Sequence, residues 1–145
     1  MPFSRILVAV DGSETSDKVF NIAAQLSKLS HGKLYVVHVV MPLSVGAFDY
    51  YDASVIQRFQ EDLEERGKSL LAKYTALGER DYNITIETIL TQGSPPDAIL
   101  REATSKEADL IVVGSKGFSG LKQLFIGSVP NSVLHHAKIA VLLVK

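Results

Sequence analysis

The sequence predicts an α/β sandwich in which parallel strands alternate with helices. Five short segments are rich in apolar and β-branched residues, and four segments with apolar residues at helical spacing follow them in alternation. Such alternation implies right-handed crossovers between parallel strands, which place helices on both faces of one sheet. The chain has 145 residues, the usual size of one domain, so we expect residues 1–145 to form a single domain.

Four of the five expected strands are nearly continuous apolar runs, which is typical of parallel strands covered on both faces. They lie at residues 6–10, 34–40, 110–113 and 139–144. The third expected strand, residues 84–90, mixes apolar and polar residues. We therefore expect it at a less covered edge of the sheet.

The first two expected helices follow the first two strands. Acidic residues Glu14 and Asp17 suit the positive end of a helix dipole, and Gly32 stands where a C-terminal cap is expected. The second helix carries its apolar stripe from Val55 to Tyr74 and ends near residue 78. Residues 41–53 match neither period, so we expect a long loop there.

The last two expected helices have distinct starts. Ser94 as a cap, proline in the first turn and Asp97 three residues after the cap predict the third helix. The fourth opens at Gly127-Ser128. If the strand order is 3-2-1-4-5, the topological switch point lies between strands one and four, and ligands bind at the carboxyl ends of those strands.

Composition excludes several classes of protein. There are no cysteines, so disulfides, thiolate catalysis and cysteine metal sites are excluded. The net charge of −1 argues against a general nucleic-acid binder, which usually shows a basic surface. No apolar run approaches the roughly 18 residues of a membrane span, and the first residues lack the pattern of a signal peptide. We expect a cytoplasmic protein that binds neither membranes nor nucleic acid.

Glycine and polar residues follow directly after the two strands that flank the expected switch point. Asp11-Gly12-Ser13 follows the first strand, and the segment 114-GSKGFSGLKQLFIGS-128 follows the fourth. A glycine-rich turn that leads into a helix N-terminus supplies amide donors and positive potential for phosphate groups. Residues 118–126 would then cover the site as a lid, with Lys116 and Lys122 adding charge. Neither a P-loop nor a dinucleotide fingerprint is present.

The spacing of these glycines resembles a known family signature. Gly114-x-x-Gly117, nine residues and then Gly127-Ser128 is similar to the G-x2-G-x9-G-[ST] signature of the nucleotide-binding branch of the universal stress protein family. The resemblance covers almost the whole chain. It includes, in order, residues 6–14 (ILVAVDGSE), 37–40 (VHVV), 93–95 (GSP) and 133–138 (VLHHAK).

This resemblance implies a Rossmann-like fold that binds ATP, usually as a homodimer, with a regulatory rather than a well-defined catalytic function. The sequence supplies no obvious water-activating base beside the γ-phosphate, so we expect slow hydrolysis or none. The resemblance implies no catalytic residue. Asp11 would lie beside the nucleotide and help to place a Mg or Mn ion. The other residues implied to contact the nucleotide are Ala9 and Val39 at the adenine, Gly114 at the ribose, and Ser115, Lys116, Gly117, Gly127, Ser128 and Val129 at the phosphates.

Several alternatives stay open at this point. Asp11 can cap the first helix instead of, or as well as, meeting a ligand. The protein could be a slow metal-dependent ATPase, or a dimeric interaction module with a vestigial nucleotide site. The final strand would be an apolar edge that a second copy of the chain covers in a homodimer.

The histidines favour structural roles. His135 and His136 are adjacent on a helix, so their side chains point about 100° apart and do not form one metal-binding face. Their position near a helix C-terminus is favoured by the helix dipole. His38 lies within an expected strand, so we expect it to pack there.

Overall fold

The computed structural model describes residues 3–43, 51–116 and 126–145. Gly117, Lys122, residues 118–125 of the expected lid and residues 44–50 of the expected loop lie outside this part of the chain. The strands form one parallel sheet in the order β3-β2-β1-β4-β5, as the sequence predicts. The strands are β1 (Arg5–Ala9), β2 (Lys33–Val40), β3 (Ile86–Gln92), β4 (Leu110–Gly114) and β5 (Ala140–Val144).

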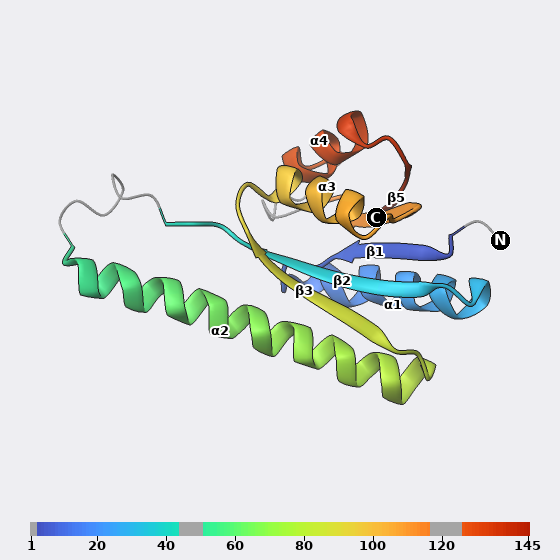
Figure 1. Ribbon diagram of the computed structural model, residues 1–145, viewed down its shortest axis with the longest axis horizontal. Coiled ribbons are helices and arrows are strands. Elements are labelled where there is room, and N and C mark those ends of the chain that lie inside the picture. Colours follow the sequence, from blue (N-terminus) through green and yellow to red (C-terminus); the bar gives the residue numbers. More distant parts are fainter. Residues whose placement is uncertain (1–2, 44–50, 117–125) are drawn as a thin grey trace.

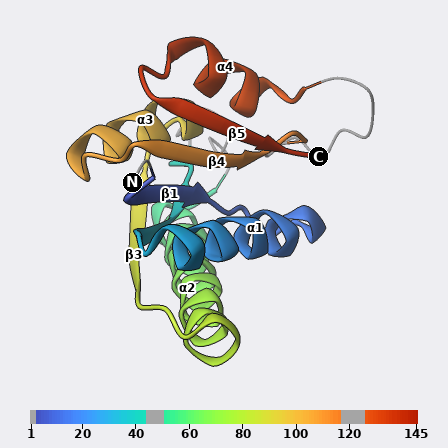
Figure 2. The same cartoon turned by 90° about the vertical axis from the view of Figure 1, so that its right-hand side faces the viewer.

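Helices cover both faces of this sheet, so the fold is the expected Rossmann-like three-layer sandwich (Figures 1 and 2). On one face lie the two helices that follow β1 and β2. On the other lie those that follow β3 and β4. In chain order the helices are α1 (Glu14–Ser30), α2 (Ala53–Leu77), the π-helical turn η2 (Gly78–Tyr82), α3 (Pro95–Ser105) and α4 (Ser128–His136).

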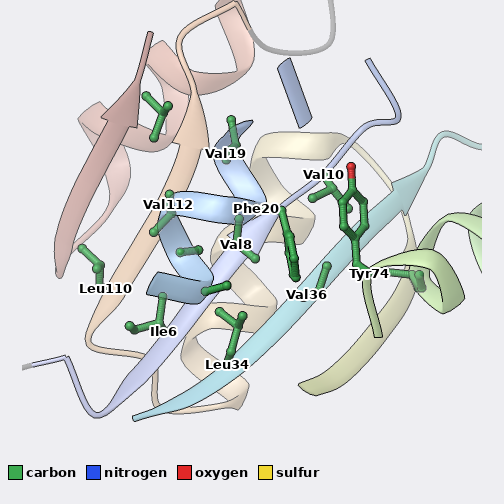
Figure 3. Close-up of a cluster of buried hydrophobic side chains, with 14 residues drawn as sticks. Ile6, Val8, Val10, Val19, Phe20, Leu34, Val36, Tyr74, Leu110 and Val112 are labelled. Atoms are coloured by element: carbon green, nitrogen blue, oxygen red, sulfur yellow. The ribbon is translucent and has the colours of Figure 1, made fainter. Parts of the chain in front are cut away.

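Alternate residues of the central strands fill two separate cores, because successive side chains of a strand point to opposite faces. Ile6, Val8 and Val10 of the first strand and its extension meet α1 and α2. There the rings of Phe20 and Tyr74 pack against each other, tilted by 35°, with centroids 4.6 Å apart (Figure 3). The opposite core lies under α3 and α4. Its buried strand residues are Leu7, Ala9, Tyr35, Val37, Val39, Ile111 and Val113.

The boundary between α2 and β3 differs from the expected one. Helix α2 ends at Leu77, close to the predicted end near residue 78, but the chain continues directly into η2, which Asn83 ends in the left-handed conformation at φ 52°. The amide of Ile84 still donates to the Gly78 carbonyl, at 3.1 Å. Strand β3 therefore begins at Ile86, two residues later than predicted. β3 and β5 are the two edges of the sheet, as the sequence predicts.

The C-terminus of α1 corrects the role expected for Gly32. His31, not the glycine, takes the left-handed conformation, at φ 53° and ψ 32°. The Gly32 amide donates to the Ser27 carbonyl at 2.9 Å. A β-carbon on Gly32 would lie 2.5 Å from the Phe3 carbonyl oxygen, so glycine is needed here for close backbone approach.

The start of α3 agrees in part with its predicted capping pattern. Ser94 precedes α3 with an extended backbone and Pro95 opens the helix, as predicted, but the Ser94 side chain makes no capping hydrogen bond. Within the described residues, no helix is long and apolar enough to span a membrane.

Candidate functional site

A small cavity lies at the switch point, where the carboxyl ends of β1 and β4 diverge. Its volume is about 20 Å³, room for a single water molecule. Four elements contribute to its wall: β1 with its following turn, α1, β4 and α4. The lining residues are Ala9, Asp11, Thr15, Ser16, Val19, Val113, Gly114, Val129 and Pro130.

The turn after β1 places Asp11 at this cavity. Gly12 has a φ of 82°, which is strained for residues with a side chain, and the turn leads directly into α1. Asp11 Oδ1 accepts hydrogen bonds from the Ser13 amide at 2.9 Å and from the Ser16 hydroxyl at 2.8 Å. Ser13 is the N-cap residue, and its own side chain makes no capping bond. The structural role left open for Asp11, stabilising the start of α1, is therefore present.

Ser16 is a member of this site that the sequence reasoning missed. Only 3% of its surface is exposed, and its hydroxyl oxygen also accepts hydrogen bonds from the amides of Asp11 (3.0 Å) and Gly12 (3.1 Å). A signal was available in the sequence. Ser16 stands three residues after the N-cap, the position from which a polar side chain reaches back to the backbone before a helix.

The end of β4 and the start of α4 close the other side of the site through backbone hydrogen bonds. The Ser115 amide donates to the Val144 carbonyl at 2.7 Å, and the Gly127 amide donates to the Ser115 carbonyl at 2.8 Å. The Gly127 amide is thus already engaged, contrary to the expectation that it is available to phosphate. Within the described segments, the Ser128 and Val129 amides have no acceptor. Pro130 has no amide to offer.

The structure brings together part of the expected set of residues. Ala9, Asp11, Gly114 and Val129 line one cavity. Val39 does not line it, although it is buried in the same core as Ala9 and Val129, under α3 and α4. Four further expected residues do not line the cavity, although each lies within two positions of Gly114 or Val129 along the chain: Ser115, Lys116, Gly127 and Ser128.

Two of the histidine rings, those of His38 and His136, bond to backbone carbonyls. The His38 ring donates from Nδ1 to the Val10 carbonyl at 2.9 Å, so it supports the strand end that carries Asp11. His135 and His136 lie in the last turn of α4, as predicted, and His136 Nδ1 bonds the Ser132 carbonyl at 2.8 Å. Across residues 3–43, 51–116 and 126–145, no three histidine or carboxylate side chains are grouped to hold a metal ion.

Asp11 alone can contribute only part of a metal site. Two donors occupy its Oδ1, which leaves Oδ2 as the oxygen without a described partner. Magnesium prefers six oxygen ligands and commonly takes one or two carboxylates together with substrate phosphates and water. The donor set present therefore fits a metal ion that arrives with a phosphate ligand, and does not fit one held by the protein alone.

Comparison with known proteins decides the family. The sequence model of the universal stress protein family matches residues 2–145. The chain belongs to this family. It is 34% identical over 150 residues to universal stress protein YxiE of Bacillus subtilis, with 99% of each chain covered. Because the alignment with YxiE spans 99% of this chain, the match extends well beyond the glycine-rich segment.

Solved structures of this family share the fold. Universal stress protein UspA from Lactobacillus plantarum superposes with a TM-score of 0.87 at 21% identity, covering 100% of this chain and 99% of that one. A universal stress protein in complex with cAMP has a TM-score of 0.75 at 26% identity, with 100% and 99% covered. A universal stress protein from Archaeoglobus fulgidus in complex with dAMP has a TM-score of 0.70 at 24% identity, with 100% of both chains covered.

Proposed function

We propose that this universal stress protein is a regulatory protein that binds ATP at the switch point between β1 and β4. The observation that carries this proposal is the meeting of three segments at one cavity: the turn after β1, the end of β4 and the first turn of α4. Phosphate groups are favoured at a helix N-terminus because amides and the helix dipole point there. The family member that binds cAMP supports an adenine nucleotide as the ligand class.

The proposed ligand places its phosphates at α4. The amides of Ser128 and Val129 have no acceptor in the described part of the chain, and Gly127, the N-cap residue, has no side chain that could cap them. The backbone of Gly114 and Ser115 and the charge of Lys116 would lie beside the same phosphates. Gly117, outside the described residues, belongs to the proposed set through the family signature.

The adenosine part would lie across the carboxyl ends of β1 and β2. The backbone around Ala9 and Asp11 and that of Val39 would contact the adenine, because the side chains of Ala9 and Val39 are buried in the core under α3 and α4. Asp11 would meet the nucleotide or its magnesium ion through Oδ2. The cavity of about 20 Å³ holds only a water, so most of the nucleotide would lie outside it, toward the carboxyl edge of the sheet.

The site favours binding over turnover. A general base must accept a proton from the attacking water, and it acts from within hydrogen-bond reach of that water. The one carboxylate that lines the cavity, Asp11, accepts two hydrogen bonds from the protein at Oδ1, and the proposed ligand or its magnesium ion takes Oδ2, so neither oxygen is left to accept a proton from water. We therefore propose that hydrolysis is slow or absent and that the loaded protein acts through its partners.

The test begins with freshly purified full-length protein. Denaturation and chromatography identify any nucleotide that it carries, and calorimetric titration with ATP, ADP, AMP and cAMP, with and without magnesium, measures affinity. Gly127→Val should abolish ATP binding, because its side chain blocks the approach to α4. Gly127 has φ −60° and ψ 161°, a conformation that valine adopts readily, so the fold should persist.

Thr85→Val serves as a control, because it introduces the same side chain at an exposed position near the start of β3, at the other end of the sheet. It should bind ATP as the wild type does. Wild-type protein that carries no nucleotide and binds none of the four would refute the proposed function. Normal ATP binding by Gly127→Val would refute the placement of the phosphates.

A homodimer through β5 is the second part of the proposal. This strand pairs with β4 on one side only, and its residues are apolar, so it is an edge that benefits from cover. Leu134 on the neighbouring α4 is 41% exposed. A second copy related by a two-fold axis would bury both features. Light scattering at micromolar concentration should give twice the 15.8 kDa mass of the chain, and a monomer would refute the dimer.

A further inference from the structure

We infer that Ser16 is the positioning residue of the nucleotide site, because its hydroxyl holds the Asp11 carboxylate in the orientation that meets the ligand. This inference rests on the proposed function above. It adds to that function a residue outside the glycine signature. Ser16 would act through Asp11 rather than by touching the nucleotide's reacting atoms.

The Ser16 hydroxyl has no hydrogen-bonding capacity left over. A hydroxyl donates one hydrogen bond and accepts two. Ser16 donates to Asp11 Oδ1 at 2.8 Å and accepts from the amides of Asp11 at 3.0 Å and Gly12 at 3.1 Å. Since the residue is 3% exposed, bulk water has little access to replace these bonds. One buried hydroxyl therefore ties the carboxylate to the backbone of its own turn.

This arrangement determines which oxygen Asp11 offers. Oδ1 accepts from Ser16 and from the Ser13 amide, whereas no described residue donates to Oδ2. The carboxylate therefore presents one oxygen, in a direction held by two bonds to the other. Such an oxygen binds a hydrogen-bond donor of the ligand or a divalent cation, and it repels a bare phosphate oxygen. Pre-organisation of this kind improves affinity because less freedom is lost on binding.

The same helix provides a matched control. Ser27 is 1% exposed and its hydroxyl donates to the Gly32 carbonyl at 2.7 Å, at the opposite end of α1. It does not line the switch-point cavity. Both serines are buried residues of α1 whose hydroxyls bond the adjoining turn. Ser16→Ala and Ser27→Ala therefore remove the same group, and only the first removes it next to Asp11.

The experiment compares five full-length proteins: wild type, Ser16→Ala, Ser27→Ala, Asp11→Ala and the double variant Asp11→Ala/Ser16→Ala. Calorimetry gives the Kd for magnesium ATP, and urea unfolding gives the stability. Both serine variants should unfold at lower urea concentration, because each loses a buried hydrogen bond. Only Ser16→Ala should bind ATP more weakly, by about tenfold, since it loses a bond to a charged group.

The double variant separates positioning from structure. If Ser16 acts through Asp11, adding Ser16→Ala to Asp11→Ala should change the Kd by less than about twofold, because the two effects are coupled. Ser16→Cys keeps a similar volume with a weaker donor, so it should fold and bind with an intermediate Kd. It replaces Ser16→Ala if the latter does not fold.

Three results would overturn the inference. Equal ATP affinity in Ser16→Ala and Ser27→Ala would remove any special role for Ser16. A full tenfold loss in the Asp11→Ala background would show that Ser16 does not act through the carboxylate. Wild-type protein that binds no adenine nucleotide would refute the proposed function itself, together with the inference, whereas the first two results leave ATP binding by the wild type intact.

Discussion

An aspartate lies at each end of the parallel strands: Asp109 at their amino ends, called here the amino edge, and Asp11 at their carboxyl ends, the carboxyl edge. Of these two aspartates, only Asp11 has a carboxylate oxygen to which no described residue donates a hydrogen bond. At the amino edge, Asp109 accepts from the Ser4 amide (2.8 Å), the Ser4 hydroxyl (3.0 Å) and the Arg5 amide (3.1 Å), so both of its oxygens are occupied. At the carboxyl edge, Asp11 uses one oxygen. A polar group paired within the protein stabilises the fold, whereas an unpaired one is available to a ligand.

The size of a hollow does not distinguish the two edges. A groove of about 770 Å³ opens near the amino edge, between the end of α1 and the start of β3, whereas the switch-point cavity measures about 20 Å³. The larger groove borders Glu87, whose carboxylate is already paired with Lys33 and Lys106 at 3.1 and 2.7 Å. The smaller cavity borders the Asp11 carboxylate and the start of α4. The open donors and acceptors, rather than the volume, point to the site.

Replacing each of the two aspartates by alanine should give the largest effects on ATP affinity and on stability. Asp11→Ala should weaken ATP binding by at least about thirtyfold, because the site loses its one carboxylate acceptor and the positioned turn. Asp109→Ala should leave ATP affinity unchanged and lower the free energy of unfolding by about 2 kcal/mol, because donors at the start of β1 lose their acceptor. Calorimetry and urea unfolding on both variants measure the two effects. If Asp109→Ala weakened ATP binding as much as Asp11→Ala, the edges would not be functionally distinct.

A smaller effect is expected at Gly32. Gly32→Ala would place a β-carbon 2.5 Å from the Phe3 carbonyl and 3.1 Å from that of Ser4. Relieving this contact should cost about 1–3 kcal/mol of stability, the range seen for overpacked sites. ATP affinity should not change. Chemical denaturation checks the first statement and titration the second, and an unchanged urea midpoint would show that the N-terminal segment moves aside freely.

The smallest effect concerns the ion pairs at Glu87. Hydrogen bonds from Lys106 and Lys33 lower the pKa of the Glu87 carboxyl below its ordinary value of 4.5. A lowered pKa means that the pairs stabilise the folded protein above the ordinary pKa and lose this contribution as the pH falls through the lowered folded pKa. Because these side chains are partly exposed, salt should weaken the effect.

Glu87→Gln provides the measurement. The variant should unfold at a slightly lower urea concentration than wild type at pH 7, and the two midpoints should converge as the pH falls below the lowered pKa of Glu87. Lys68 and Glu65 form an exposed pair 3.5 Å apart on α2, so Glu65→Gln is a control for a pair within one helix. A difference between Glu87→Gln and wild type that grew on acidification would contradict the assigned direction.

Local patterns predicted most of the architecture. The apolar runs at residues 6–10, 34–40 and 110–113 lie within one residue of β1, β2 and β4, because a strand covered on both faces admits few polar side chains. The polar third run was correctly placed at an edge but two residues too early. That shift comes from η2, whose π-helical hydrogen bonds have no distinct sequence pattern.

The sequence predicted some residues of the site and missed others, because local patterns indicate only groups that are close along the chain. Asp11 and Gly114 were found because each directly follows one of the apolar runs in the sequence, residues 6–10 and 110–113. Ser16 was overlooked although its place three residues after the N-cap was a signal, because its three hydrogen bonds to Asp11 and Gly12 form only when the turn folds back on the first turn of α1. The engagement of the Gly127 amide by Ser115 joins residues twelve positions apart, and no local pattern indicates it.

The sequence by itself determined the order of strands and helices, the two turns that flank the switch point and the family signature, because periodicity and turn chemistry act over a few residues. Tertiary structure decided which hydrogen-bonding groups are paired and which stay open. That outcome depends on distances between segments far apart in the chain, such as Ser4 with Asp109 and Ser115 with Val144. Packing sets those distances, and they separate the structural edge of this sheet from the edge proposed to bind ATP.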